Sequence, residues 1–174
     1  KKVYVIAVIT LIVGIIVCFV ISNTIGFSPL DKYFKITFYW GTYRGGIWAQ
    51  CIELFKDFSI KEKFFGIGPE SLRYIFNSSA MFANETIDQA HNEYLNYLLT
   101  TGLLGLSSYL FMIFSVCVVV LKMLKNNTLA IGVFSSLVAY WIQGLFNLTQ
   151  PFTTPIMYIY IAIIGGLVYS NGNR

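Results

Sequence analysis

The single histidine of the chain, His91, is followed by Asn92 and lies where a long polar stretch runs into an apolar one. An imidazole has an ordinary pKa of about 6.5, so its neutral form can accept a proton from a hydroxyl group. Nine residues separate Asn92 from Gly102, and Gly105 follows after two more. Because residues 94–101 are mostly apolar, these glycines predict a helix that packs closely or begins again at this point. His91 is therefore a candidate general base beside a membrane helix.

Two further features of the polar stretch could take part in the same chemistry. Arg44 stands just before an amphipathic helix, predicted from apolar residues that recur at helical spacing between Ile47 and Phe58. A guanidinium group stays charged and binds phosphate oxygens through two parallel hydrogen bonds, and a helix N-terminus favours the same anion. Gly66 and Gly68 form a predicted turn that ends at Pro69. The alternatives are an Arg44 that pairs with a loop carboxylate or lies at the membrane interface, and glycines that serve packing alone.

Together, these residues resemble the signature of the O-antigen ligase and O-antigen polymerase family. The shared features are the His-Asn pair, its spacing to Gly-x-x-Gly, an arginine that opens a loop helix, and a Gly-x-Gly turn. The sequence departs from the pattern at the two glycines that follow Arg44, where a more regular helix start is expected. The resemblance covers most of the chain. It implies the C-terminal part of an all-α membrane enzyme whose full-length relatives have roughly ten or more spans.

The resemblance also implies an activity and a set of site residues. The enzyme moves a glycan from a polyprenyl-diphosphate carrier to an acceptor hydroxyl during assembly of O-antigen, capsule or exopolysaccharide. The implied transfer is inverting and uses no metal ion and no cofactor. The acceptor is a glycan, a lipid or a protein, so polymerase and ligase both remain open. The implied roles are His91 as base, Arg44, Arg73 and Asn92 as substrate-binding residues, and Gly66, Gly68, Gly102 and Gly105 as structural residues.

Composition independently indicates an integral membrane protein, since 56% of the residues are hydrophobic and 11% are charged. Apolar stretches at residues 3–21, 103–121, 129–148 and 156–169 predict about four membrane-spanning helices. All eight acidic residues lie between Asp31 and Glu93, whereas Lys1, Lys2, Lys122, Lys125 and Arg174 lie at one set of helix ends. The positive-inside rule then places both termini in the cytoplasm and residues 22–92 outside a bacterial cell membrane.

This topology divides the chain into five parts. They are a span at 1–21, a large helical extracytoplasmic loop at 22–92, a re-entry helix and span at 93–124, a span at 125–148, and a span with a cytoplasmic tail at 149–174. Within the loop, residues 61–63 are predicted to close the first helix, and Pro69 is predicted to open a second at about 70–76. Asp88 is the predicted N-cap of a third helix, with His91 in its first turn.

Two other classes of protein fit parts of the sequence. One is a component of a polysaccharide or lipid-linked oligosaccharide transporter, which predicts ionisable residues within the spans, and the predicted spans contain none. The other is a non-catalytic scaffold, for which His91 would be dispensable. A nucleic-acid partner is not indicated, because the basic residues are explained by topology. The three cysteines give no zinc spacing, and only Cys51 lies in the loop.

Overall fold

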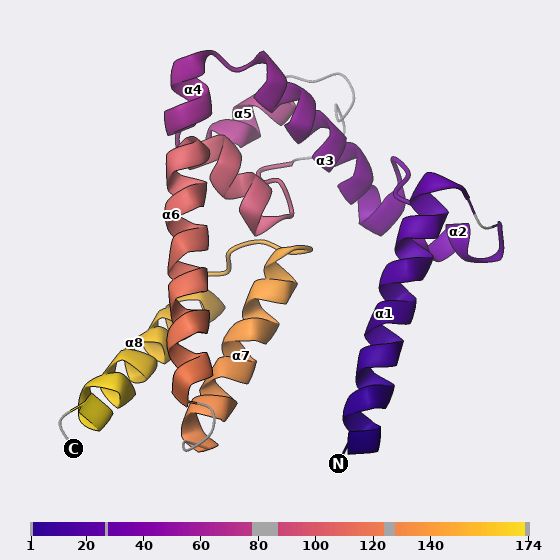
Figure 1. Ribbon diagram of the computed structural model, residues 1–174. Helices are drawn as coiled ribbons and strands as arrows, with labels where there is room; N and C mark the ends of the chain where they lie inside the picture. The colour runs from indigo at the N-terminus through magenta and orange to yellow at the C-terminus, as the bar shows by residue number, and fades with distance from the viewer. Residues whose placement is uncertain (1, 27, 78–86, 124–127, 173–174) are drawn as a thin grey trace. The chain divides into compact units, whose positions relative to one another are not determined.

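The computed structural model describes residues 2–26, 28–77, 87–123 and 128–172, and in those ranges the chain forms eight α-helices and no strand (Figure 1). The all-α prediction is confirmed. The chain divides into two compact units, Lys1–Ile47 and Trp48–Arg174. Each unit is described below by itself.

The first unit contains α1 (Lys2–Thr24), α2 (Ser28–Phe34) and the beginning of α3 (Trp40–Asp57). The apolar run of α1 ends at Ser22, Asn23 and Thr24, and the side-chain amide of Asn23 bonds to the chain that follows. Its Nδ2 donates to the Phe34 carbonyl at 2.8 Å and its Oδ1 accepts from the Ile36 amide at 2.8 Å. Since α2 packs on α1, these bonds fix the segment that leads into α3.

The second unit is organised around α6 (Glu93–Met123), which packs against α4 (Ile60–Phe65), α5 (Ser71–Asn77), α7 (Thr128–Gly144) and α8 (Thr153–Gly172). Figure 1 shows α6, α7 and α8 side by side. Their shared core takes one stripe from each helix at helical spacing. Its buried members are Tyr109, Val116 and Val120 from α6, Ala130, Val133, Leu137 and Trp141 from α7, and Met157 and Ile164 from α8.

The outer faces of these helices are apolar and exposed, as expected for helices that contact lipid. Phe111 and Phe114 on α6 are 71% and 65% exposed, and Ile159 on α8 is 57% exposed. Two helices, Glu93–Met123 and Thr153–Ser170, are long and apolar enough to cross a membrane. Two shorter apolar helices, Thr10–Thr24 and Thr128–Gly144, accompany them. Two candidate spans are thus observed, and the total of four stays a prediction.

The short helices of the loop differ from their predicted boundaries. Lys61 and Lys63 do not close α3 but lie within α4, because Ser59 begins a new helix by accepting from the Glu62 amide in a capping box. Glu70 has a φ of 63°, so α5 begins at Ser71 and Pro69 does not open it. The predicted span to residue 148 is also too long. α7 ends at Gly144, after which the Leu145 and Phe146 amides bond to carbonyls three residues back.

Candidate active site

The helix α6 is divided at Gly102, whose φ of 70° and ψ of −170° interrupt the helical backbone. A short helical segment of residues 93–101 therefore precedes the long segment of residues 103–123. This combination of angles is essentially restricted to glycine, because a Cβ atom would collide with the neighbouring backbone. The sequence left open whether Gly102 permits close packing or restarts a helix, and in the structure it does both.

The close packing at Gly102 is with the turn at Gly66, so two glycines from the family pattern lie back to back. A Cβ atom on Gly102 would overlap the Phe64 carbonyl, and one on Gly66 would overlap the Thr100 carbonyl. The turn also pairs with the end of the short segment: the Ile67 amide donates to Leu99 O and the Gly68 amide to Thr100 O, each at 3.0 Å. The C-terminal end of residues 93–101 is thereby bound to the Gly-x-Gly turn.

The other end of this short segment carries the His-Asn pair. Asn92 is the N-cap, since its Oδ1 accepts from the Leu95 amide at 3.0 Å, and its Nδ2 donates to the Leu145 carbonyl at 2.9 Å. The indole of Trp48 donates to the Ala90 carbonyl at 3.1 Å on the other side of His91. The predicted helix from Asp88 is wrong, because α6 begins at Glu93 and His91 precedes it in a left-handed conformation with φ 50°. His91 is half-buried.

Glu93, the next residue, is a site feature that the sequence did not reveal. Its side chain is 1% exposed, and its Oε1 accepts from the hydroxyl groups of Tyr109 at 3.1 Å and Tyr140 at 3.3 Å. Nothing in the sequence separates Glu93 from the seven other acidic residues of the same stretch. Its partners lie in two different apolar helices, so only the fold shows that it is buried.

In the first unit, Arg44 stands where the regular part of α3 begins. The preceding residues Gly41, Thr42 and Tyr43 have φ angles of 60°, 60° and 65°, so they form a turn and not a helix. Arg44 Nη1 donates to the Gly41 carbonyl at 2.7 Å, while its buried Nε makes no hydrogen bond to a described residue. One edge of the guanidinium group is thus held by the turn itself.

The two glycines after Arg44 are explained by close packing of the preceding loop. A Cβ atom on Gly45 would overlap the Thr37 carbonyl, and one on Gly46 would lie 2.5 Å from the Phe38 ring. The Gly46 amide also donates to the Phe38 carbonyl at 3.0 Å. The departure from a regular helix start therefore holds the Arg44 turn against the loop at 36–38.

The remaining predicted residues are distributed as follows. Arg73 is exposed on α5, in the same unit as His91, whereas Arg44 belongs to the other unit. A Cβ atom at Gly105 would overlap the side chain of Thr101, one turn earlier in α6. The predicted residues that the structure brings together are thus Gly66, Gly68 and Gly102, at the far end of the segment that carries His91 and Asn92.

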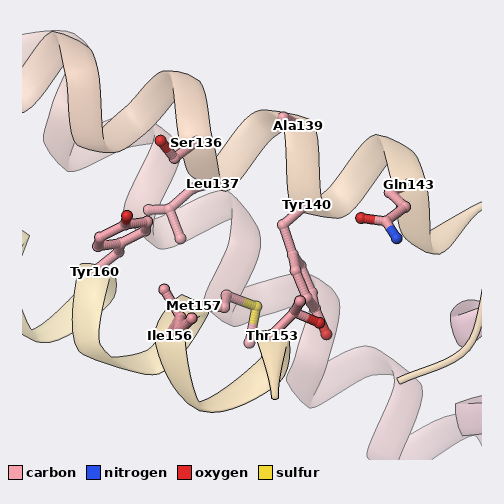
Figure 2. Close-up of a pocket in the computed structure, with 9 residues that line it drawn as sticks. All are labelled: Ser136, Leu137, Ala139, Tyr140, Gln143, Thr153, Ile156, Met157 and Tyr160. Carbon is pink, nitrogen blue, oxygen red and sulfur yellow. The ribbon is translucent and has the colours of Figure 1, made fainter. Parts of the chain in front are cut away.

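A groove of about 320 Å³ between α7 and α8 contains none of the predicted residues (Figure 2). Its floor is apolar, with Leu137 and Met157 among the lining residues. Figure 2 shows the Tyr140 hydroxyl beside Thr153 at one end of it, and Tyr140 also bonds to Thr154 Oγ1 at 2.7 Å. The polar end of this groove is therefore connected to Glu93 through Tyr140.

The fold and these residues define an all-α membrane protein with a histidine fixed at the start of a short helix by contacts from distant segments. Residues 1–110 match the family model described as O-antigen ligase, and because this is more than half of the chain, the protein belongs to that family. Members are membrane enzymes that transfer lipid-linked glycans in surface polysaccharide assembly. Searches of curated proteins and of solved structures each found no match. The matched residues include His91, Arg44 and all the glycines discussed above as part of the pattern.

Proposed function

We propose that the protein transfers a glycan from a polyprenyl-diphosphate carrier to an acceptor hydroxyl at the bacterial cell surface. The observation that carries this proposal is the double anchoring of the His91 segment. Asn92 binds the Leu145 carbonyl at one end of residues 93–101, and the Gly66–Gly68 turn binds the other end. A base that must meet a hydroxyl within hydrogen-bond distance benefits from such fixation.

The proposed reaction is a single inverting displacement. His91 takes the proton of the acceptor hydroxyl while that oxygen forms a bond to the anomeric carbon, and the bond from this carbon to the diphosphate oxygen breaks. Polyprenyl diphosphate leaves with the bonding electrons, and the proton remains on His91. The departing diphosphate needs positive charge more than it needs a proton from an acid. Arg44 supplies this charge, and Arg73 is an additional candidate for the same role.

Asn92 has a different part in this proposal. Both halves of its amide are engaged, one with the Leu95 amide and the other with the Leu145 carbonyl. These bonds favour a role in fixing the start of α6 over direct contact with a substrate hydroxyl. Asn92 then contributes to transfer by holding the backbone next to His91.

The direct test uses the whole protein in lipid vesicles with a polyprenyl-diphosphate-linked glycan and an acceptor. The expected result is a new glycosidic bond of inverted configuration, with release of polyprenyl diphosphate at an unchanged rate when EDTA is added. Two acceptors are compared. A polymerase transfers the glycan to a second lipid-linked repeat unit, whereas a ligase transfers it to the molecule that carries the finished glycan. Movement of the intact donor across the membrane, with no new bond, would instead support a transporter component.

The proposed role of Arg44 depends on the shape of its guanidinium group as well as its charge. We expect Arg44→Lys to lower the transfer rate about tenfold, because a lysine cannot make two parallel bonds to a phosphate, and Arg44→Ala to lower it further. The rate per inserted protein measures this. Lys61→Ala, which removes an exposed cation from α4, is the control and should transfer normally. A normal rate for Arg44→Lys would mean that charge alone suffices.

The proposal includes a topology, with residues 22–92 outside and the termini and residues 122–128 in the cytoplasm. In a cysteine-free background, Lys61→Cys should react with a membrane-impermeant maleimide in intact cells. Lys122→Cys should react only after the membrane is permeabilised. Labelling of both positions in intact cells would contradict this orientation.

A further inference from the structure

Three consecutive side chains directly after His91 bond to residues near the end of α7 or just beyond it. Asn92 donates to the Leu145 carbonyl at 2.9 Å, Glu93 accepts from the Tyr140 hydroxyl at 3.3 Å, and Tyr94 donates to the Trp141 carbonyl at 2.9 Å. Bonds between sequence positions this far apart form only in the folded bundle. The start of α6 is therefore fixed to the end of α7 at three successive positions.

Glu93 is the most deeply buried of the three. Within the part of the chain that the structure describes, no basic side chain forms an ion pair with it. A buried carboxyl group without hydrogen bonds would be strongly destabilising, and here two tyrosine hydroxyl groups donate to one of its oxygens. A Cβ atom at Gly144 would lie 2.7 Å from the other oxygen, Oε2, so the glycine leaves room for the carboxyl group.

The network of Glu93 extends to all three helices of the bundle. Tyr109 belongs to the long segment of α6, Tyr140 to α7, and Thr154 of α8 bonds to the Tyr140 hydroxyl at 2.7 Å. A single side chain two positions from His91 thus links the short segment of α6 to each helix of the bundle. The family match ends at residue 110, so Tyr140 and Thr154 lie outside the matched residues.

We propose that Glu93 is a positioning residue that holds His91 in place for proton transfer. The expected effect on the transfer rate rests on the proposed function, whereas the expected effect on the position of His91 does not. The carboxyl group acts as a double hydrogen-bond acceptor that fixes the backbone after His91. Its charge is not needed for this role. Glutamine can replace it, since an amide oxygen also accepts two hydrogen bonds, whereas alanine cannot.

The kinetic test compares Glu93→Ala and Glu93→Gln in the whole protein, per inserted molecule. Misplacement of a catalytic group by about 1 Å can cost about a hundredfold in rate. We expect a loss of this order in kcat for Glu93→Ala with little change in KM, and near-normal kcat for Glu93→Gln. Glu53→Gln, which changes an exposed carboxyl group on α3, is the matched control. Equal losses in the alanine and glutamine variants would overturn the proposal, because they would show that the charge is required.

A second readout does not depend on transfer. Diethyl pyrocarbonate modifies histidine, and His91 is the only histidine of this chain. With a His91→Ala protein as the blank, His91 should be modified several times faster in Glu93→Ala than in wild type, and at the wild-type rate in Glu93→Gln. If Glu93→Ala does not insert, the Tyr109→Phe/Tyr140→Phe pair replaces it, with faster modification expected there too. Wild-type modification rates in both would overturn the proposal, whereas an active His91→Ala enzyme would overturn only the proposed function.

Discussion

Replacement of His91 by asparagine or alanine should lower the rate of glycan transfer about 10²–10⁴-fold, because neither side chain can take a proton from the acceptor. The two variants are needed together. His91 has a φ of 50°, a conformation that asparagine tolerates better than alanine does. A loss in both variants therefore measures the missing base, whereas a loss in alanine alone would measure backbone strain.

The measurement is the amount of glycan transferred to the acceptor, and of lipid-linked precursor, in cells that express the whole protein. Less transferred glycan with accumulated precursor is expected for both variants, with normal amounts of inserted protein. A wild-type amount of transferred glycan from His91→Asn would contradict the assignment of His91 as the base.

Replacement of Gly102 by alanine should disrupt the site from its other end. The backbone angles at Gly102 are essentially restricted to glycine, and a Cβ atom there would overlap the Phe64 carbonyl. Backbone strain of about 1–3 kcal/mol and a similar cost for overpacking together predict a destabilisation of about 2–6 kcal/mol. We expect the Gly66 turn to separate from α6 and transfer to be lost.

Gly165→Ala is the matched control for this variant. Gly165 lies within α8 and a Cβ atom there would meet nothing within 4 Å, so alanine should be neutral or slightly stabilising. Denaturant unfolding in detergent compares the two proteins. Equal stability of Gly102→Ala and wild type would show that the turn can move away without loss, contrary to the packing described above.

The parts of the site that could be predicted from the sequence are those with local signals. The apolar period of α3, the apolar stretches of α6 and α8 and the positions of the glycines are local signals, and so is the Ser59–Glu62 capping box. The residue at which α6 starts is not set by a local signal. Asp88 carries an ordinary N-cap signal, but the actual cap, Asn92, is also bound to a carbonyl 53 residues later. Burial of Glu93 depends likewise on tyrosines from helices further along the chain.

The reason for the two glycines after Arg44 also could not be predicted from the sequence. In the sequence they look like a weak helix start, because glycine lowers helix propensity. In the structure they are where the loop at 36–38 lies against the backbone, a contact that no period or propensity encodes.

The short segment of residues 93–101 also sets a fixed distance within the site. Its two ends are each fixed, one by Asn92 to the end of α7 and the other by the Gly66–Gly68 turn. Nine helical residues span roughly 13 Å, and one inserted residue would add about 1.5 Å and turn the histidine by about 100° around the axis. The nine-residue interval in the His-Asn-x9-Gly pattern is then a length, set by the distance between two anchors, so a change in the number of residues between them would break one anchor or displace His91.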